Sequence, residues 1–139
     1  MLVVGVISTV VADGYERLLE VTLAGQGGSL WISALEPEQW AQSGQQSKVF
    51  RAGEPVELEV FLRYVNTVAA PTPEELTGLR QPIARSSHTV LVGKVSRIVE
   101  SNIFECSTEW QALLVQFERD TALSIDQRIK VSGELAAAG

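Results

Sequence analysis

Apolar and polar side chains alternate along several segments of the chain, most clearly near its middle. Val56, Leu58, Val60, Leu62 and Tyr64 occupy every second position there. Because side chains two residues apart point to the same face of a strand, this spacing predicts a half-buried β-strand with these five residues facing inward. Seven further segments, rich in β-branched residues, are predicted to be strands: 3–11, 18–23, 30–33, 89–99, 103–106, 113–117 and 129–135.

Turn-forming residues such as Asp13 and Gly14 separate these segments. Short connections of this kind join antiparallel neighbours, because parallel strands need long crossovers. We therefore predict a mainly β protein, built as an antiparallel Greek-key barrel or sandwich. A first β subdomain is expected at residues 1–70 and a second at 88–139, with a linker at 71–87, unless the whole chain forms one joint domain.

Two short helices are predicted between the strands. Thr72 can cap the free amides of a helix that has Pro73 at its first position and ends at Gly78, and Glu75 completes the pattern of a capping box. This helix would lie in the linker. The second candidate is a single turn over residues 37–44.

Part of the sequence pattern occurs twice. Residues 3–8 (VVGVIS) resemble residues 91–96 (LVGKVS), which lie 88 positions later, and residues 50–58 parallel residues 123–131, which lie 73 positions later. The order is the same in both halves. Either the chain contains an old duplication or the resemblance is accidental.

The strand of residues 91–96, taken with that of residues 129–135, resembles small Greek-key barrels of the oligonucleotide/oligosaccharide-binding (OB) type. The resemblance implies two OB-like subdomains and a ligand-binding face across the central strands. That family uses aromatic side chains for stacking and cations for phosphate, whereas the strand around Leu58 carries Glu57 and Glu59. The resemblance therefore favours the fold more than the usual ligand.

The formal net charge is −6, and acidic residues outnumber basic ones by eight to four in residues 1–66 and by nine to seven in residues 67–139. No basic stripe is available to displace counterions from phosphates, so a basic protein is a better partner than nucleic acid. Residues 1–7 lack the basic start of a signal peptide, and no apolar run approaches the roughly 20 residues that span a bilayer. We expect a cytoplasmic protein without membrane association.

The sequence contains no recognisable catalytic or metal-binding signature. His88 is the single histidine and Cys106 the single cysteine, so neither a His-rich nor a Cys-type metal site can form. Cys106 follows Phe104 by two positions in an alternating segment, and both are expected in the core, as is Trp110. A dyad of His88 with a serine or with Cys106 is the catalytic alternative. We predict that the protein is not an enzyme and holds no cofactor.

Trp40 lies in a polar segment, EPEQWAQSG, between residues 36 and 44. An exposed Trp40 ringed by carboxylates would have the composition of a protein-binding hot spot, and the alternative is that it folds back as a lid over one barrel end. The carboxylates of Glu57 and Glu59 form another pair, which would project about 7 Å apart from one face of a strand. The predicted partner-binding residues are Glu36, Glu38, Trp40, Glu57 and Glu59.

Small size, acidity and a β-rich composition without catalytic groups are similar to the profile of small bacterial immunity or inhibitor proteins. This resemblance, which no motif supports, implies a non-catalytic protein-binding module that neutralises a toxin enzyme. One alternative is an OB-type binder of single-stranded nucleic acid or oligosaccharide. Another is a structural subunit of an assembly, in which an exposed strand edge of this protein extends the sheet of a neighbour; the sequence does not give the oligomeric state. If the protein binds nucleic acid, the basic residues that are close enough in the sequence to form a local patch are Arg80, Arg85, Lys94 and Arg97.

Overall fold

In the computed structural model, which describes residues 1–25, 27–42, 45–108 and 111–138, the protein is all-β, and ten strands form one mixed sheet. All eight predicted strands are present, whereas the two shortest, β5 and β6, were not predicted. The strands are β1 (Leu2–Asp13), β2 (Glu16–Leu23), β3 (Ser29–Leu35), β4 (Pro55–Val65), β5 (Val68–Ala69), β6 (Gly78–Arg80), β7 (His88–Glu100), β8 (Ile103–Ser107), β9 (Ala112–Phe117) and β10 (Arg128–Ala137).

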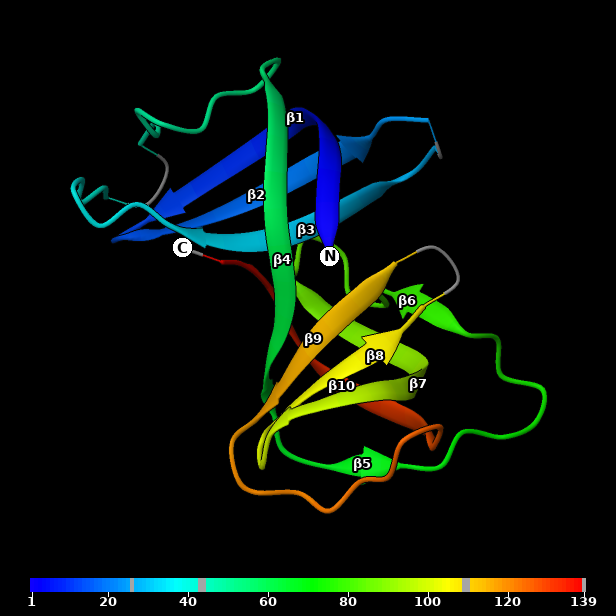
Figure 1. Ribbon diagram of the computed structural model, residues 1–139. Helices are drawn as coiled ribbons and strands as arrows, with labels where there is room; N and C mark the ends of the chain where they lie inside the picture. Colours follow the sequence, from blue (N-terminus) through cyan, green and yellow to red (C-terminus); the bar gives the residue numbers. More distant parts are fainter. Residues whose placement is uncertain (26, 43–44, 109–110, 139) are drawn as a thin grey trace.

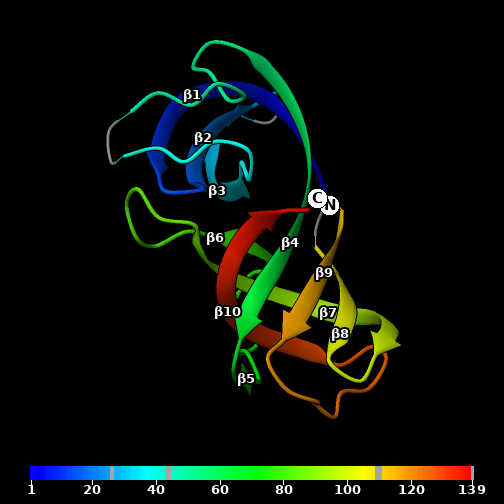
Figure 2. The same ribbon diagram turned by 90° about the vertical axis from the view of Figure 1, so that its left-hand side faces the viewer.

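The strand pairings form two closed circuits that share β4 and β10. One circuit runs β10, β3, β2, β1, β4, and the other runs β10, β7, β8, β9, β4; the pairing of β4 with β10 closes both. β4 extends through both halves of the molecule (Figure 1), and β10 lies beside it in the side view (Figure 2). Strands from both halves contribute to one apolar core, for example Leu19, Ile32, Leu62, Phe104, Leu113 and Leu135.

Two of the pairings are parallel, which corrects the expectation of a purely antiparallel protein. β3 pairs with β10 through Ser33 and Ala136, and β4 pairs with β9 through Leu62 and Val115. Short turns specify the pairing only of strands that follow one another directly in the chain. These partners are separated by several other strands, and that length of chain supplies the crossover that a parallel pair requires.

The repeat in the sequence corresponds to a repeat in the structure. Gly5 of β1 lies opposite Val56 of β4. Gly93 of β7, 88 residues after Gly5, lies opposite Ile129 of β10, 73 residues after Val56. The two offsets found in the sequence therefore relate equivalent strand pairs.

Equivalent irregularities occur in the two halves as well. The register of β1 shifts around Ser8 and that of β7 around Ser96, its counterpart. At these bulges the Ser8 hydroxyl donates to the carbonyl oxygen of Glu20 at 3.2 Å, and the Ser96 hydroxyl donates to that of Glu105 at 3.1 Å. Because bulges interrupt regular pairing at defined positions, their recurrence favours a common origin of the two halves.

No helix forms within the described residues. That part of the chain therefore contains no helix that could cross a bilayer. One of the two bonds of a capping box forms, from the Thr72 amide to Glu75 Oε1 at 3.1 Å, whereas the Glu75 amide donates to the Thr72 backbone carbonyl at 3.2 Å, which is the bond of a simple turn. However, Arg128 donates to the carbonyl oxygens of both residues. A continuing helix would need these acceptors, so the segment makes one turn only.

The second predicted helix, residues 37–44, is also wrong over the residues that the structure describes. Ala41 exchanges two backbone hydrogen bonds with Gly14, of 2.7 and 2.9 Å. These bonds direct the amide and the carbonyl of Ala41 towards the β1–β2 turn, where they cannot serve a helix. Gly44 and Trp110, to which predictions were also attached, lie outside the described residues.

Candidate functional site

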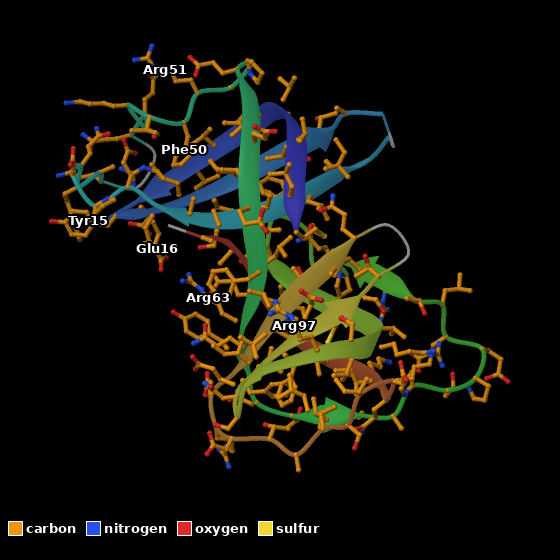
Figure 3. All side chains as sticks on the ribbon, viewed as in Figure 1. Tyr15, Glu16, Phe50, Arg51, Arg63 and Arg97 are labelled. Atoms are coloured by element: carbon orange, nitrogen blue, oxygen red, sulfur yellow. The ribbon has the colours of Figure 1, made fainter. Side chains whose placement is uncertain are left out.

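An exposed aromatic pair marks the end of the molecule where β1 turns into β2. Trp40 exposes 65% of its surface, and its ring packs edge-on against Tyr15 with the centroids 5.1 Å apart. Tyr15 projects from the tip of the β1–β2 turn (Figure 3) and is 47% exposed. Leu35 and Val49, both exposed, line one depression beside the pair. We call Tyr15, Leu35, Trp40 and Val49 the Trp40 surface.

The position of Trp40 depends on a glycine beneath it. Gly14 has a φ of 63°, and a Cβ atom on this residue would lie 3.2 Å from Cζ3 of Trp40. The glycine therefore permits the left-handed turn conformation and allows the indole ring to lie against the backbone. The Gly14–Ala41 hydrogen bonds then fix the backbone beside Trp40.

A buried ion pair connects the segments that carry these side chains. Arg17 Nε lies 2.6 Å from Glu36 Oε2, and both side chains are almost fully buried. The Arg17 guanidinium also donates to the carbonyl oxygens of Gly14 and Glu16, each at 2.9 Å, and to that of Gln39 at 2.8 Å. A single side chain thus joins the β1–β2 turn to the segment that follows β3.

The carboxylate of Glu36 extends the same network towards β4. It accepts hydrogen bonds from the Ser47 hydroxyl at 2.7 Å and from the Val49 amide at 3.0 Å. Burial by itself would raise the pKa of Glu36, but the hydrogen bonds from Ser47 and Arg17, the charge of Arg17 and the Val49 amide outweigh it and hold the pKa below its usual value. Glu36 is therefore ionised at neutral pH.

This network holds the backbone around the Trp40 surface in place. A buried ion pair adds little net stability, because the desolvation of both charges opposes their attraction. Its clearest consequence here is positional, since it fixes the backbone beside Tyr15, Trp40 and Val49. Preorganised side chains lose less conformational entropy when they bind.

Charged side chains surround the Trp40 surface. Asp13, Glu16 and Glu38 are exposed beside it, and Lys48 lines the same depression, of about 480 Å³, as Leu35. A second depression, of about 710 Å³, is lined mainly by residues 45–48 and 50–52. Figure 3 shows Phe50 and Arg51 near this end of the molecule; both line the second depression.

The five predicted partner-binding residues do not form one surface. Glu36 is buried in its ion pair, whereas Glu38 and Trp40 are exposed at the Trp40 surface. Glu57 and Glu59 project from β4 opposite Val4 and Leu2, at the other end of β1. Glu59 Oε1 also lies 2.7 Å from the amino nitrogen of Met1.

Sequence reasoning missed three members of the Trp40 surface and the arginine that supports it. Tyr15 gave a usable signal, because an aromatic residue directly after Asp13-Gly14 lies in a turn, where few side chains can be buried. Leu35 and Val49 are ordinary apolar residues in the sequence. Nor does any local pattern show that Arg17 is fully buried, because its partner Glu36 is 19 residues away.

The Trp40 surface lies where the two halves of the repeat differ. The connection from β3 to β4 comprises residues 36–54, whereas the equivalent connection from β9 to β10 comprises residues 118–127 and is therefore about half as long. The longer connection contains Glu36, Trp40 and Val49. The first half thus carries side chains that its counterpart lacks.

The geometry does not support nucleophilic catalysis by the single thiol. Cys106 is fully buried, as predicted, and burial together with the charge of Glu105 raises the pKa of its thiol to about 12. It pairs with Val95, seven residues along β7 from His88. In the described ranges, no three His, Cys, Asp or Glu side chains are arranged to hold a metal ion.

Two of the four cations considered for nucleic acid already have partners. The Arg85 guanidinium lies 5.6 Å from the ring centroid of Trp31, and Arg97, visible on the lower half in Figure 3, lies 3.2 Å from Glu105. Arg80 and Lys94 are exposed on β6 and β7. These positions do not amount to a continuous basic stripe.

Comparison with known proteins gives no match: no family model, no curated protein and no solved structure is significantly similar to the chain.

Proposed function

We propose that this protein is a non-catalytic protein-binding module that binds a basic protein through the Trp40 surface, in the manner of small bacterial immunity or inhibitor proteins that neutralise a toxin enzyme. The observation that carries the proposal is the exposed Trp40–Tyr15 pair, held from below by the buried Arg17–Glu36 ion pair. Tryptophan and tyrosine dominate hot spots in protein interfaces. A tryptophan that lacks a binding role would be expected to bury more of its ring.

The size of the aromatic contribution can be estimated. A hot-spot side chain in a protein interface contributes about 2 kcal/mol or more when truncated to alanine, which corresponds to a roughly 30-fold change in affinity. Trp40 has enough exposed area for such a role, and Tyr15 supports its ring from the side. Replacement of Trp40 by alanine should therefore weaken the affinity for the partner enough for the complex to dissociate on dilution.

The acidic side chains are proposed to guide the encounter with the partner. Asp13, Glu16 and Glu38 are exposed near the aromatic pair, and the protein as a whole carries a net charge of −6. Complementary charge raises association rates more than it raises affinity. Reversal of Glu16 and Glu38 to lysine should slow association and weaken its dependence on salt.

We also propose that each five-strand circuit is a small OB-like Greek-key barrel and that the two barrels share β4 and β10. The support is that each circuit closes on itself with five strands, as OB barrels do. Such a closed support would keep the β1–β2 turn rigid. The domain boundaries given by the sequence remain a prediction.

The test is an affinity pull-down of the tagged protein from its native lysate, after nuclease treatment and at moderate salt, followed by mass spectrometry. Three proteins are compared: the wild type, Trp40→Ala, and Leu76→Ala as a matched control, because Leu76 is 84% exposed on a different turn. We expect the wild type and Leu76→Ala to recover the same basic protein in stoichiometric amount, and Trp40→Ala to lose it.

Other outcomes would argue against the proposal. Recovery that disappears on nuclease treatment would indicate the nucleic-acid alternative. If a partner were recovered equally by all three proteins, the Trp40 surface would not be its binding site. A partner recovered through an exposed strand edge would instead support an assembly subunit.

A further inference from the structure

A further groove, formed by residues distant from Trp40 in the chain, lies at the end of β4 beside β7 and β10. It has a volume of about 440 Å³, and its lining includes Tyr64, Asn66, Ser87, His88, Ser132 and Glu134. We call it the Tyr64 groove. Its volume falls within the range of small-molecule sites, and its lining combines one aromatic ring with many hydrogen-bonding groups.

Tyr64 reaches the groove because β4 is irregular at this point. Alternation predicted that Tyr64 would face inward, but the ring is 57% exposed, which corrects that prediction. Leu62 and Val65, three residues apart, are both fully buried, and the register against β9 shifts between them. The extra residue is accommodated by a positive φ of 59° at Tyr64.

This conformation is unfavourable for a tyrosine. Residues other than glycine, asparagine and aspartate seldom adopt it, and each such residue costs on the order of 1 kcal/mol or more. Asparagine or glycine would fit the backbone better. The tyrosine ring is therefore retained at a position where the backbone favours other residues, and strained residues of this kind cluster at functional sites.

Arg63 contacts two of the residues that line the groove, Tyr64 and Glu134. Its guanidinium carbon lies 4.7 Å from the ring centroid of Tyr64, and Nη2 lies 3.5 Å from Glu134 Oε1. Figure 3 shows Arg63 beside β4, between the two halves of the molecule. Arg63 thus orients the ring and offsets the charge of Glu134, so it is a positioning residue for both.

The remaining polar groups of the groove are available to a ligand. Within the described ranges, the side chains of Asn66, Ser87, His88 and Ser132 make no hydrogen bond to another protein group. They supply hydroxyl, amide and imidazole groups that can both donate and accept. With Glu134 balanced by Arg63, the groove favours a neutral ligand rich in hydroxyl groups.

We propose that the Tyr64 groove binds a neutral carbohydrate of one or two sugar rings. The C–H face of a sugar ring is apolar and packs on an aromatic ring, whereas its hydroxyl groups at the rim match the serine, amide, imidazole and carboxylate groups. Because Arg63 and Glu134 already offset each other, the groove offers no net charge to attract an anionic or a cationic sugar. This site is separate from the Trp40 surface and does not depend on the function proposed for it.

The test is saturation-transfer-difference NMR on the intact protein with glucose, galactose, N-acetylglucosamine and their β-linked disaccharides at millimolar concentration. Tyr64→Asn removes the ring but keeps a residue that suits the backbone, so its melting temperature should equal or exceed that of the wild type. Ser132→Leu fills the exposed side of the groove. Trp40→Ala serves as the control because it leaves the groove intact.

We expect at least one of these sugars to receive saturation from the wild type and from Trp40→Ala. Its Kd should rise about tenfold or more in Tyr64→Asn, as the loss of an aromatic contact predicts, and Ser132→Leu should not bind. The proposal is overturned if none of the sugars binds the wild type, or if binding is unchanged in both groove variants. Loss of sugar binding in Trp40→Ala would also contradict it, because that result would place the sugar at the other surface.

Discussion

Leu62 of β4 lies directly opposite Leu135 of β10, and each of these residues is the counterpart of the other in the repeat, 73 positions apart. Both side chains are fully buried. The pair lies in the two strands that close both circuits, so it belongs equally to both halves. The two halves therefore share one core at this point.

Replacing either leucine should destabilise the whole molecule. We expect Leu62→Ala and Leu135→Ala each to lower the free energy of unfolding by about 2–5 kcal/mol, as is usual for buried leucines. Because the residues are direct neighbours, the double variant should deviate from additivity by about 0.5 kcal/mol or more. Urea unfolding followed by tryptophan fluorescence measures all four proteins. Strict additivity would mean that the two halves are stabilised independently.

The repeat also predicts where glycine is required. A Cβ atom on Gly5 would lie 2.1 Å from the carbonyl oxygen of Thr22, and one on Gly93 would lie 2.7 Å from that of Ser107. These neighbours are backbone atoms, so alanine must separate the paired strands. We expect Gly5→Ala and Gly93→Ala to cost about 3 kcal/mol each, at the upper end for overpacking, with the larger loss at Gly5.

The matched controls for these glycines are their exposed neighbours, Val6→Ala and Lys94→Ala, which should each cost less than about 1 kcal/mol. Urea midpoints at constant m-value provide the comparison. If Gly5→Ala were as stable as Val6→Ala, the close approach of β1 to β2 would not be a constraint on the fold.

Alternation and turn residues were sufficient to predict the eight long strands, because each of these signals is local. The strand around Leu58 is an example, since every second side chain from Val56 to Leu62 faces the interior side. The same rule failed at Tyr64, because the pairing with β9 inserts a bulge that only the partner strand reveals. Parallel pairing was missed for the same reason: it joins strands that are distant in the chain.

In the candidate site, too, the residues that could be predicted are those with a local signal, and the residues that were missed depend on partners distant in the chain. Trp40 and Glu38 could be selected from composition, because a tryptophan among carboxylates is unusual in any structure. Glu36 could not be distinguished from Glu38, since its burial depends on Arg17 from another strand. No local pattern indicates the Tyr64 groove, which combines residues from β4, β7 and β10.

Tyr64 provides a test of backbone strain that is separate from ligand binding. Tyr64→Val and Tyr64→Asn both remove the ring and its contact with Arg63, but valine is poorly suited to a φ of 59° and asparagine is well suited to it. We expect the valine variant to be less stable than the asparagine variant by about 1–2 kcal/mol in urea unfolding. Equal stabilities would mean that the bulge relaxes when the ring is removed.

The Glu36–Arg17 pair should make stability depend on acid. The pKa of Glu36 is lowered in the folded protein from the usual value of 4.5, so the unfolded chain binds more protons between the two values and stability rises with pH across that window. This contribution is complete above about pH 5.5 and is lost as the pH falls through the lowered folded-state value. Protonation would leave Arg17 buried without a charged partner.

Glu36→Gln isolates this contribution. At pH 7 we expect the variant to lose about 3 kcal/mol, because it leaves a buried charge unpaired, whereas Glu38→Gln should stay within about 0.5 kcal/mol of the wild type. Urea midpoints measured from pH 7 to pH 3 should fall less steeply for Glu36→Gln than for the wild type. A residual slope is expected, since the pKa values of Glu20 and Glu75 are also lowered, mainly by hydrogen bonds from Thr9 and Lys130. Parallel curves for the wild type and Glu36→Gln would show that the carboxylate is not held in its charged form by the fold, and the account of how the Trp40 surface is kept in place would then be wrong.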